Sequence, residues 1–197
     1  MNLLLTGPPG AGKNTIGRLC AKRLSYDYVD VDDLIVTRAK KTIPEIFAQH
    51  GETVFRAFER EAVKQSIIQD KCVIALGGGA LLDQDNRALA ATAGPIICLR
   101  ASETSIRARL GEETERPLLS LKDGHENRTA LSELLRTRSD HYDSFTLQLS
   151  TDTLTPGMAV DRIVDELMPW STTVHTATDG YPLILANGSR AYLPRLL

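Results

Sequence analysis

Residues 7–15 read Gly-Pro-Pro-Gly-Ala-Gly-Lys-Asn-Thr, and this stretch decides the fold. A short apolar run, Leu3 to Leu5, precedes it, and a helical pattern, Ile16 to Leu24, follows it. A glycine-rich loop between a strand and a helix turns its backbone N–H groups toward an anion, and the positive end of the helix adds to the attraction. Lys13 supplies a point charge for the β- and γ-phosphates. This order of strand, loop and helix predicts a nucleotide-phosphate site.

One position of the loop is unusual. Loops of this type place Ser or Thr after the lysine, where the hydroxyl binds Mg²⁺, whereas this chain has Asn14. An amide oxygen can bind Mg²⁺, but the side chain is longer and the ion demands tight octahedral geometry. We therefore expect weakened metal binding or slower turnover, with no loss of the fold.

The composition limits the classes of partner. The 197 residues suit one α/β domain of about 170 residues plus a remainder. Lys and Arg total 23 against 25 Asp and Glu, a net charge of −2, which argues against a nucleic-acid or membrane-surface partner. No apolar run reaches the roughly 18–20 residues of a membrane span, and the chain enters a strand without an export signal. We expect a cytoplasmic protein whose Cys20, Cys72 and Cys98 are buried free thiols.

Short apolar runs alternate with longer amphipathic stretches, which predicts strands separated by helices. The predicted strands are 2–6, 26–30, 72–76, 95–99 and 145–149. The predicted helices are 13–24, 32–40, 43–49, 52–69, 87–92, 103–110, 127–142 and 156–168. Three strands are almost wholly apolar, as expected for a parallel sheet covered on both faces. The pattern predicts a doubly wound α/β fold with ligands beyond the carboxyl ends of the strands.

Two segments depart from this pattern. Residues 111–125 are rich in charge, with two glycines and a proline, and a loop of this length in a phosphoryl-transfer domain predicts a mobile lid. Residues 169–173 resemble a linker, and residues 181–185 resemble a strand that runs into a turn at Gly188.

Two carboxylates follow the second predicted strand. Asp30 and Asp32 are two residues apart, so in an extended chain both point to the same side, toward the phosphate loop. One could hold Mg²⁺ through water, and the other could orient an acceptor hydroxyl or take its proton. The alternative is that Asp30 to Asp33 merely cap the next helix.

Residues 52–61 form an amphipathic pattern in which Arg56 and Glu59 share one helix face, so each could hold the other in place. The planar fork of Arg56 could grip a substrate carboxylate. The alternative is a solvated surface pair.

Gly77, Gly78 and Gly79 end the third predicted strand. Three glycines in succession allow the backbone to approach a ligand closely, although they could also form a plain flexible turn. This strand lacks the acidic residue that often follows it in phosphate-loop proteins, so metal-directed carboxylates must come from Asp30 and Asp32.

Three further arginines are candidates. Arg116 lies in the predicted lid, where closure could bring it to the transferring phosphoryl group. Arg109 could stack on a purine, and Arg138 could grip a second polar part of the substrate. The alternative is that Arg116 and Arg109 are ordinary exposed arginines, which are common. For Arg138 the alternative is a cation at a helix C-terminus that interacts favourably with the helix dipole.

Six segments in order resemble shikimate kinases, a family in the nucleoside-monophosphate-kinase-like group of phosphate-loop enzymes. They are the phosphate loop, Asp30-Val31-Asp32, 43–47, 51–59, 77–80 and 116–119, and a further matching segment follows at 138–142. The resemblance covers about residues 1–168 and implies a five-stranded parallel sheet flanked by helices, with a lid loop.

The resemblance implies ATP-dependent phosphorylation of the 3-hydroxyl of shikimate, in aromatic amino-acid biosynthesis. It assigns shikimate binding to Asp32, Arg56, Gly78, Gly79 and Arg138, with Asp32 as the base. It assigns the nucleotide to Gly10, Ala11, Gly12, Lys13, Asn14, Thr15, Arg109 and Arg116, completed by a turn near 152–155. Mg²⁺ would be held at Asn14 and Asp30, and the catalytic residues would be Asp32, Lys13 and Arg116.

The segment 171–197 resembles the opening strands of 3-dehydroquinate synthase, another enzyme of the same pathway. The chain would then be a kinase domain, 1–168, followed by 169–197 as a linker and a fragment of a fused partner; the alternative is an ordinary C-terminal extension. Two other functions stay open. One is a related small-molecule kinase such as a gluconate kinase, and the other is a non-catalytic nucleotide-binding module, for which Asn14 is the support.

Overall fold

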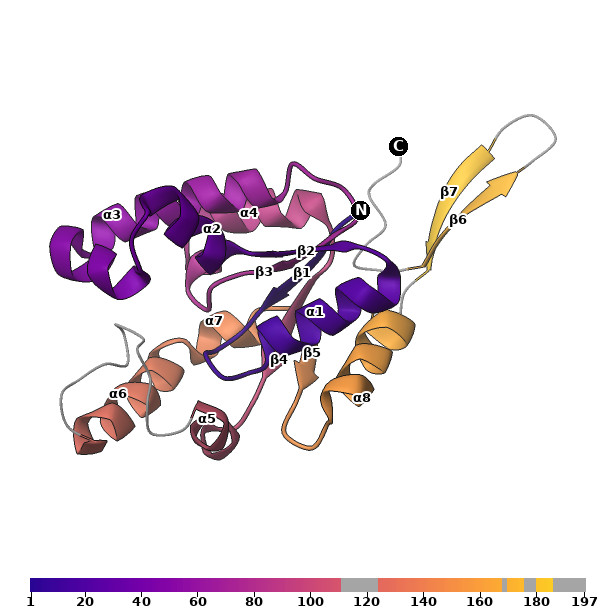
Figure 1. Cartoon of the computed structure of the whole chain (residues 1–197). Coiled ribbons are helices and arrows are strands. Elements are labelled where there is room, and N and C mark those ends of the chain that lie inside the picture. Colours follow the sequence, from indigo (N-terminus) through magenta and orange to yellow (C-terminus); the bar gives the residue numbers. More distant parts are fainter. Residues whose placement is uncertain (111–123, 168–169, 176–179, 186–197) are drawn as a thin grey trace.

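A computed structural model of the chain describes residues 1–110, 124–167, 170–175 and 180–185 (Figure 1). The first half holds β1 (Leu3–Thr6), α1 (Lys13–Leu24), β2 (Asp27–Asp30), α2 (Val31–Ala39), α3 (Ile43–Ser66), β3 (Cys72–Ala75), η1 (Ala80–Leu82), α4 (Gln84–Ala93) and β4 (Ile96–Arg100). The second half holds α5 (Glu103–Leu110), α6 (Gly124–Thr137), α7 (Ser139–Asp143), β5 (Leu147–Ser150), α8 (Pro156–Asp161), η2 (Arg162–Leu167), β6 (Trp170–His175) and β7 (Gly180–Leu185).

Five strands form one parallel sheet in the order β2-β3-β1-β4-β5. Strand β1 is central: Leu5 pairs with Ala75 of β3 on one side and with Ile97 of β4 on the other. The loop that follows β1 therefore opens at the middle of the carboxyl edge, where the strand order reverses and ligands bind in folds of this kind. The predicted doubly wound α/β fold is confirmed.

The sheet is buried on both faces because neighbouring residues of each strand point in opposite directions. Leu3 and Leu5 pack with side chains of α1 and α8, whereas Leu4 packs with those of α2 and α3. Figure 1 shows α1 and α8 on one side of the sheet and α2, α3 and α4 on the other. These two cores bury both faces of the sheet.

One predicted division between helices is confirmed, and one helix prediction differs from the structure. The element α3 spans the predicted helix 43–49 and most of the predicted helix 52–69, and Gly51 between them is not helical, with φ +75° and ψ 177°, so the predicted division is confirmed. The predicted helix 127–142 is instead two helices, α6 and α7, with Arg138 between them at φ −105° and ψ 6°. Arg138 is the N-cap of α7, so it lies at the start of a helix rather than at the end of a longer one.

The predicted linker at 169–173 is wrong from Trp170 onward. Residues 170–175 form β6, which pairs antiparallel with β7 so that Trp170 lies opposite Leu185 and His175 opposite Gly180. The strand predicted at 181–185 is confirmed as part of β7. Threonine is a favourable strand residue, and pairing with a second strand outweighed the polar composition that suggested a linker.

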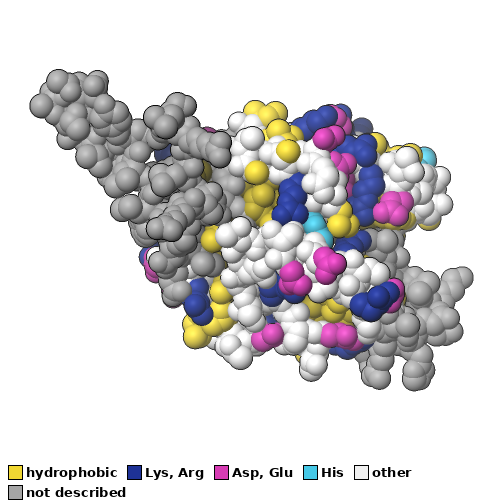
Figure 2. Space-filling view, turned by 180° about the vertical axis from the view of Figure 1, so that it is seen from behind, with side chains coloured by type: hydrophobic (Ala, Val, Ile, Leu, Met, Phe, Trp, Pro, Cys, Tyr) yellow, Lys and Arg dark blue, Asp and Glu magenta, His cyan; other side chains and the backbone are white. Residues whose placement is uncertain are grey.

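The remaining bulk expectations concern thiols, membranes and charge. Cys20, Cys72 and Cys98 are free and buried, as predicted. Within the described part of the chain, no helix combines the length and the apolar character needed to cross a membrane. Figure 2 shows the face opposite to Figure 1, on which basic and acidic side chains lie next to one another.

Candidate active site

The phosphate loop depends on glycine for its shape. Gly7, Gly10 and Gly12 have φ values of +134°, +74° and +97°, which L side chains rarely adopt. A Cβ on Gly7 would lie 2.2 Å from the carbonyl oxygen of Leu99 in β4, so this position cannot carry a side chain without displacing the sheet. Gly12 is the N-cap of α1, so the positive end of that helix faces the interior of the loop.

Lys13 is the first residue of α1, and its side chain folds back over the loop. Its Nζ donates hydrogen bonds to the carbonyl oxygens of Gly7 at 2.8 Å and Pro8 at 2.9 Å, and the residue is only 8% exposed. These bonds hold the ammonium group at the mouth of the loop. The predicted phosphate-binding residues therefore lie together around one concave stretch of backbone.

Asp30 and Asn14 form the corner where a metal is predicted. Asp30 caps α2 by accepting a hydrogen bond from the backbone N–H of Asp32 at 3.0 Å, so the capping alternative is realised at this residue. Its other carboxylate oxygen accepts a hydrogen bond from Asn14 Nδ2 at 2.6 Å. Burial, with the nearby Asp32 carboxylate adding to it, raises the pKa of Asp30 to about 6.

This corner offers oxygen ligands suited to Mg²⁺, namely the Asp30 carboxylate and the Asn14 carbonyl oxygen. Among the described residues, no group of three or more His, Cys, Asp or Glu side chains could hold a metal ion. Mg²⁺ is commonly held by one or two carboxylates together with substrate phosphates, and a buried carboxylate beside the phosphate loop fits that arrangement.

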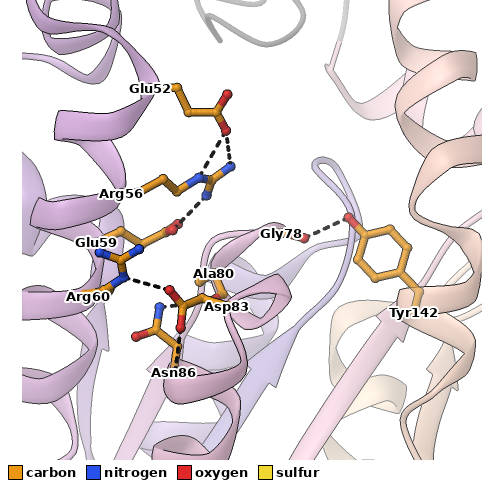
Figure 3. Close-up of polar contacts among 9 residues, drawn as sticks. All are labelled: Glu52, Arg56, Glu59, Arg60, Gly78, Ala80, Asp83, Asn86 and Tyr142. Atoms are coloured by element: carbon orange, nitrogen blue, oxygen red, sulfur yellow. Dashed lines mark hydrogen bonds and ion pairs between the residues drawn. The ribbon is translucent and has the colours of Figure 1, made fainter.

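Arg56 lies on α3 in an ordered, half-buried pair rather than a solvated one (Figure 3). Its Nη1 donates to Glu59 Oε2 at 2.7 Å, and its Nη2 donates to Glu52 Oε1 at 2.9 Å. The Arg56 side chain is 21% exposed and that of Glu59 only 3%, so the surface-pair alternative is wrong. Burial raises the pKa of Glu59, and the Arg56 guanidinium opposes that rise.

Each of the three successive glycines meets a different part of the site. A Cβ on Gly77 would lie 3.2 Å from Asp32 Oδ1 and 3.4 Å from Glu59 Oε1. A Cβ on Gly78 would lie 2.8 Å from the carbonyl oxygen of Gly7 in the phosphate loop. The segment 77–79 is therefore the floor that joins the carboxylates to the phosphate loop, and Gly78 and Gly79 form a turn within it.

Gly79 brings two arginines together. A Cβ on Gly79 would lie 3.1 Å from Arg138 Nη1 and 3.3 Å from both Arg56 Nη1 and Nη2. The two guanidinium groups come from α3 and from the start of α7, which are far apart in sequence. Two forked cations that converge on exposed backbone form an anion grip suited to a carboxylate.

Contacts outside the predicted set hold this floor in place (Figure 3). Tyr142 Oη donates to the carbonyl oxygen of Gly78 at 3.0 Å, and Asn86 Nδ2 donates to that of Ala80 at 3.0 Å. Arg60 Nε bonds Asp83 Oδ2 at 2.7 Å, which ties α3 to the start of α4. Sequence reasoning gave Tyr142 no role; its only signal was its position one helical turn after Arg138.

Arg109 lies against the phosphate loop. Its Nη1 donates to the carbonyl oxygen of Gly10 at 3.2 Å and to Thr151 Oγ1 at 2.9 Å. Asp152, in the turn predicted to border adenine, accepts a hydrogen bond from the backbone N–H of Ser102 at 2.8 Å. Arg116 and most of the predicted lid, 111–123, lie outside the described residues.

The site thus contains a phosphate loop, a carboxylate, and an anion grip that share one short segment of backbone. This arrangement can hold a nucleoside triphosphate next to a small anionic acceptor that carries hydroxyl groups. The fold and the site together define a phosphate-loop kinase that acts on a small molecule.

Comparisons with known proteins identify the family within this class of kinases. The model of the shikimate kinase family matches residues 9–168. A curated shikimate kinase from Geobacter metallireducens is 40% identical over 166 residues, which cover 84% of this chain and 89% of the relative. One from Thermodesulfovibrio yellowstonii is 39% identical over 165 residues, which cover 84% of this chain and 94% of the relative.

Solved structures agree with these sequences. The structure of shikimate kinase from Acinetobacter baumannii in complex with shikimate has a TM-score of 0.78 at 29% identity and covers 83% of this chain and 90% of that one. A shikimate kinase structure from Bacteroides thetaiotaomicron has a TM-score of 0.75 at 28% identity. The chain belongs to the shikimate kinase family.

Proposed function

We propose that this chain transfers the γ-phosphoryl group of ATP to the 3-hydroxyl of shikimate, giving shikimate 3-phosphate and ADP. The observation that carries the proposal is the convergence of Arg56 and Arg138 at Gly79, one residue from the contact between Gly78 and the phosphate loop. An acceptor held by its carboxylate at that grip lies next to the nucleotide, with Asp32 beside it.

The acceptor half of the site suits a small hydroxylated acid. Arg56 and Arg138 would hold the carboxylate by charge-assisted hydrogen bonds, and the backbone of Gly78 and Gly79 would approach the ring closely. Asp32 would accept a hydrogen bond from the reacting hydroxyl and then its proton as the phosphoryl group transfers. Polar groups that only such an acid can satisfy reject analogues that lack the carboxylate or the hydroxyl.

The nucleotide half would be built from the phosphate loop. The amides of Gly10, Ala11 and Gly12 would cradle the phosphates, Lys13 would swing from its carbonyl partners to the β- and γ-phosphates, and Thr15 would complete the loop. Arg109 would lie against adenine, and Arg116 would stabilise charge on the transferring oxygens. Mg²⁺, held by Asp30 and Asn14 together with the phosphates, would neutralise phosphate charge when bound.

The first experiment is ADP release by the purified chain with ATP and Mg²⁺, measured with and without shikimate. Strong dependence on shikimate is expected. Gluconate serves as the comparison substrate. Turnover with gluconate but not with shikimate would favour a related small-molecule kinase. Nucleotide binding without any acceptor-dependent ADP release would favour the non-catalytic module and contradict the proposal.

Asn14→Ser is expected to strengthen the binding of Mg²⁺ during turnover. The amide of Asn14 bonds the carboxylate that the metal needs, and a hydrogen bond to a charged group is worth about 1.5 kcal/mol or more. Its removal should lower the Mg²⁺ concentration that gives half-maximal rate by roughly three- to tenfold. Titration of Mg²⁺ at saturating ATP and shikimate measures this. An unchanged rate and an unchanged Mg²⁺ dependence would show that the position is neutral.

We infer that the segment after residue 169 is the first part of a fused 3-dehydroquinate synthase domain, which would make the native product multifunctional. The match to the kinase family ends at residue 168, which supports a boundary there. No synthase activity is expected from so short a segment.

Limited proteolysis of the full chain tests this boundary. Chymotrypsin is expected to cleave near Trp170 before it attacks the kinase body, and the remaining body should keep its shikimate-dependent activity. Mass spectrometry of the time course locates the first cuts. Resistance near Trp170, with cuts appearing first inside 1–168, would instead indicate an extension that packs on the kinase.

A further inference from the structure

Tyr142 is a buried polar residue that the proposed mechanism leaves without a task. It lies on α7, one helical turn after Arg138, and the residue is only 2% exposed. Its hydroxyl crosses to the floor of the site and donates to the carbonyl oxygen of Gly78 at 3.0 Å (Figure 3). Packing in the core accounts for the aromatic ring but not for the hydroxyl group. The hydrogen bond to Gly78 accounts for the hydroxyl group.

The bond fixes the orientation of one peptide group. No peptide bond in the described chain is cis, so the carbonyl of Gly78 and the N–H of Gly79 point in opposite directions across a rigid plane. Holding the oxygen therefore holds the N–H of Gly79, the residue that lies beside both Arg56 and Arg138. A glycine backbone has more conformational freedom than any other, so it gains the most from such a restraint.

Tyr142 also acts on the second partner of the grip. The Arg138 guanidinium lies close enough to the Tyr142 hydroxyl to oppose the rise in pKa that burial causes there. A Cβ on Gly78 would lie 3.2 Å from the same hydroxyl. One hydroxyl group thus touches the glycine floor and faces the arginine that grips the anion.

We propose that Tyr142 is a positioning residue for the acceptor carboxylate, which acts by fixing the Gly78–Gly79 peptide and the Arg138 guanidinium. The proposal rests on the function proposed above. Within the described part of the chain, the Tyr142 hydroxyl contacts Gly78 and faces Arg138, so its contribution belongs to acceptor binding and not to ATP binding.

The test is Tyr142→Phe in the full chain, which keeps the buried ring and removes only the hydroxyl. The KM for shikimate is expected to rise about five- to tenfold, as for the loss of one hydrogen bond near a charged group. The KM for ATP should change less than twofold. Tyr28→Phe is the matched control, since its hydroxyl is buried on β2 with no hydrogen-bond partner among the described residues; it should leave both constants unchanged.

A double-mutant cycle with Arg138→Lys separates positioning from general stability. If Tyr142 acts through the grip, its substitution should matter much less once Arg138 is replaced. Equal rises in both KM values, a shikimate KM within twofold of the parent, or full additivity with Arg138→Lys would each overturn the proposal. Failure of the proposed function gives a different result, because the parent chain itself would then show no turnover with shikimate.

Discussion

Replacing Asp32 by Asn is expected to lower kcat about 10²- to 10⁴-fold, the range that general acid–base groups contribute. The amide has the shape of the carboxylate and fits the space beside Gly77, where Asp32 Oδ1 lies 3.2 Å from the position of an added Cβ. It cannot accept a proton, so it removes the chemistry while leaving the packing. Shikimate-dependent ADP release measures the rate, and calorimetric titration with shikimate measures binding, which should weaken far less.

Asp33→Asn is the matched control for this prediction. Asp33 is the next residue on α2, but its side chain is 74% exposed and its closest cation, Arg18, lies 4.0 Å away. An exposed pair of this kind contributes little, so activity should stay near that of the parent. If Asp32→Asn retained kcat within tenfold while Asp33→Asn did not, the base would have to be sought elsewhere.

The fold followed from local patterns because the strands of a parallel sheet are apolar on both faces. Leu3 to Leu5 and Cys72 to Leu76 are continuous apolar runs, and the structure places them as the neighbouring strands β1 and β3. The break at Arg138 was not predicted, although three weak helix formers lie beside it, Thr137, Ser139 and Asp140. The apolar helical pattern runs through the break and hides it.

The candidate site was predictable where chemistry depends on sequence position, and not where it depends on contacts across the fold. Asp30 ends β2 and Asp32 follows two residues later in the first turn of α2, and three adjacent glycines are conspicuous in any sequence. The hydrogen bond from Asn14 to Asp30 and that from Tyr142 to Gly78 join residues on different elements. Spacing along the chain carries no information about such pairs, which become visible only when the sheet order is known.

Arg56→Ala is expected to damage both substrate binding and stability. Loss of two charge-assisted hydrogen bonds to the acceptor should raise the KM for shikimate by about 100-fold or more. The same change leaves Glu59 buried without its partner; breaking a buried pair costs about 3–5 kcal/mol, and the lower end applies because Arg56 is 21% exposed. Steady-state kinetics and thermal unfolding measure the two effects.

The pH dependence of unfolding should identify Glu59 as the cause of the lost stability. Burial already raises the pKa of Glu59 above its ordinary value of 4.5, and the variant removes Arg56, which opposes this rise more strongly than Arg138 does. The folded state would then hold a proton that the unfolded state releases, so the variant's stability should fall as pH rises above about 4.5. A loss of stability that is independent of pH would contradict this account.

A second substitution separates the effect of Arg56→Ala on shikimate binding from its effect on stability. Adding Glu59→Gln replaces the stranded carboxylate by a neutral amide, which needs no cation and does not titrate. The double variant should recover most of the lost stability and lose the pH dependence, yet its KM for shikimate should stay high, because nothing restores the grip. If the KM recovered together with stability, Arg56 would serve the fold alone, and the carboxylate would have to be held by Arg138 without it.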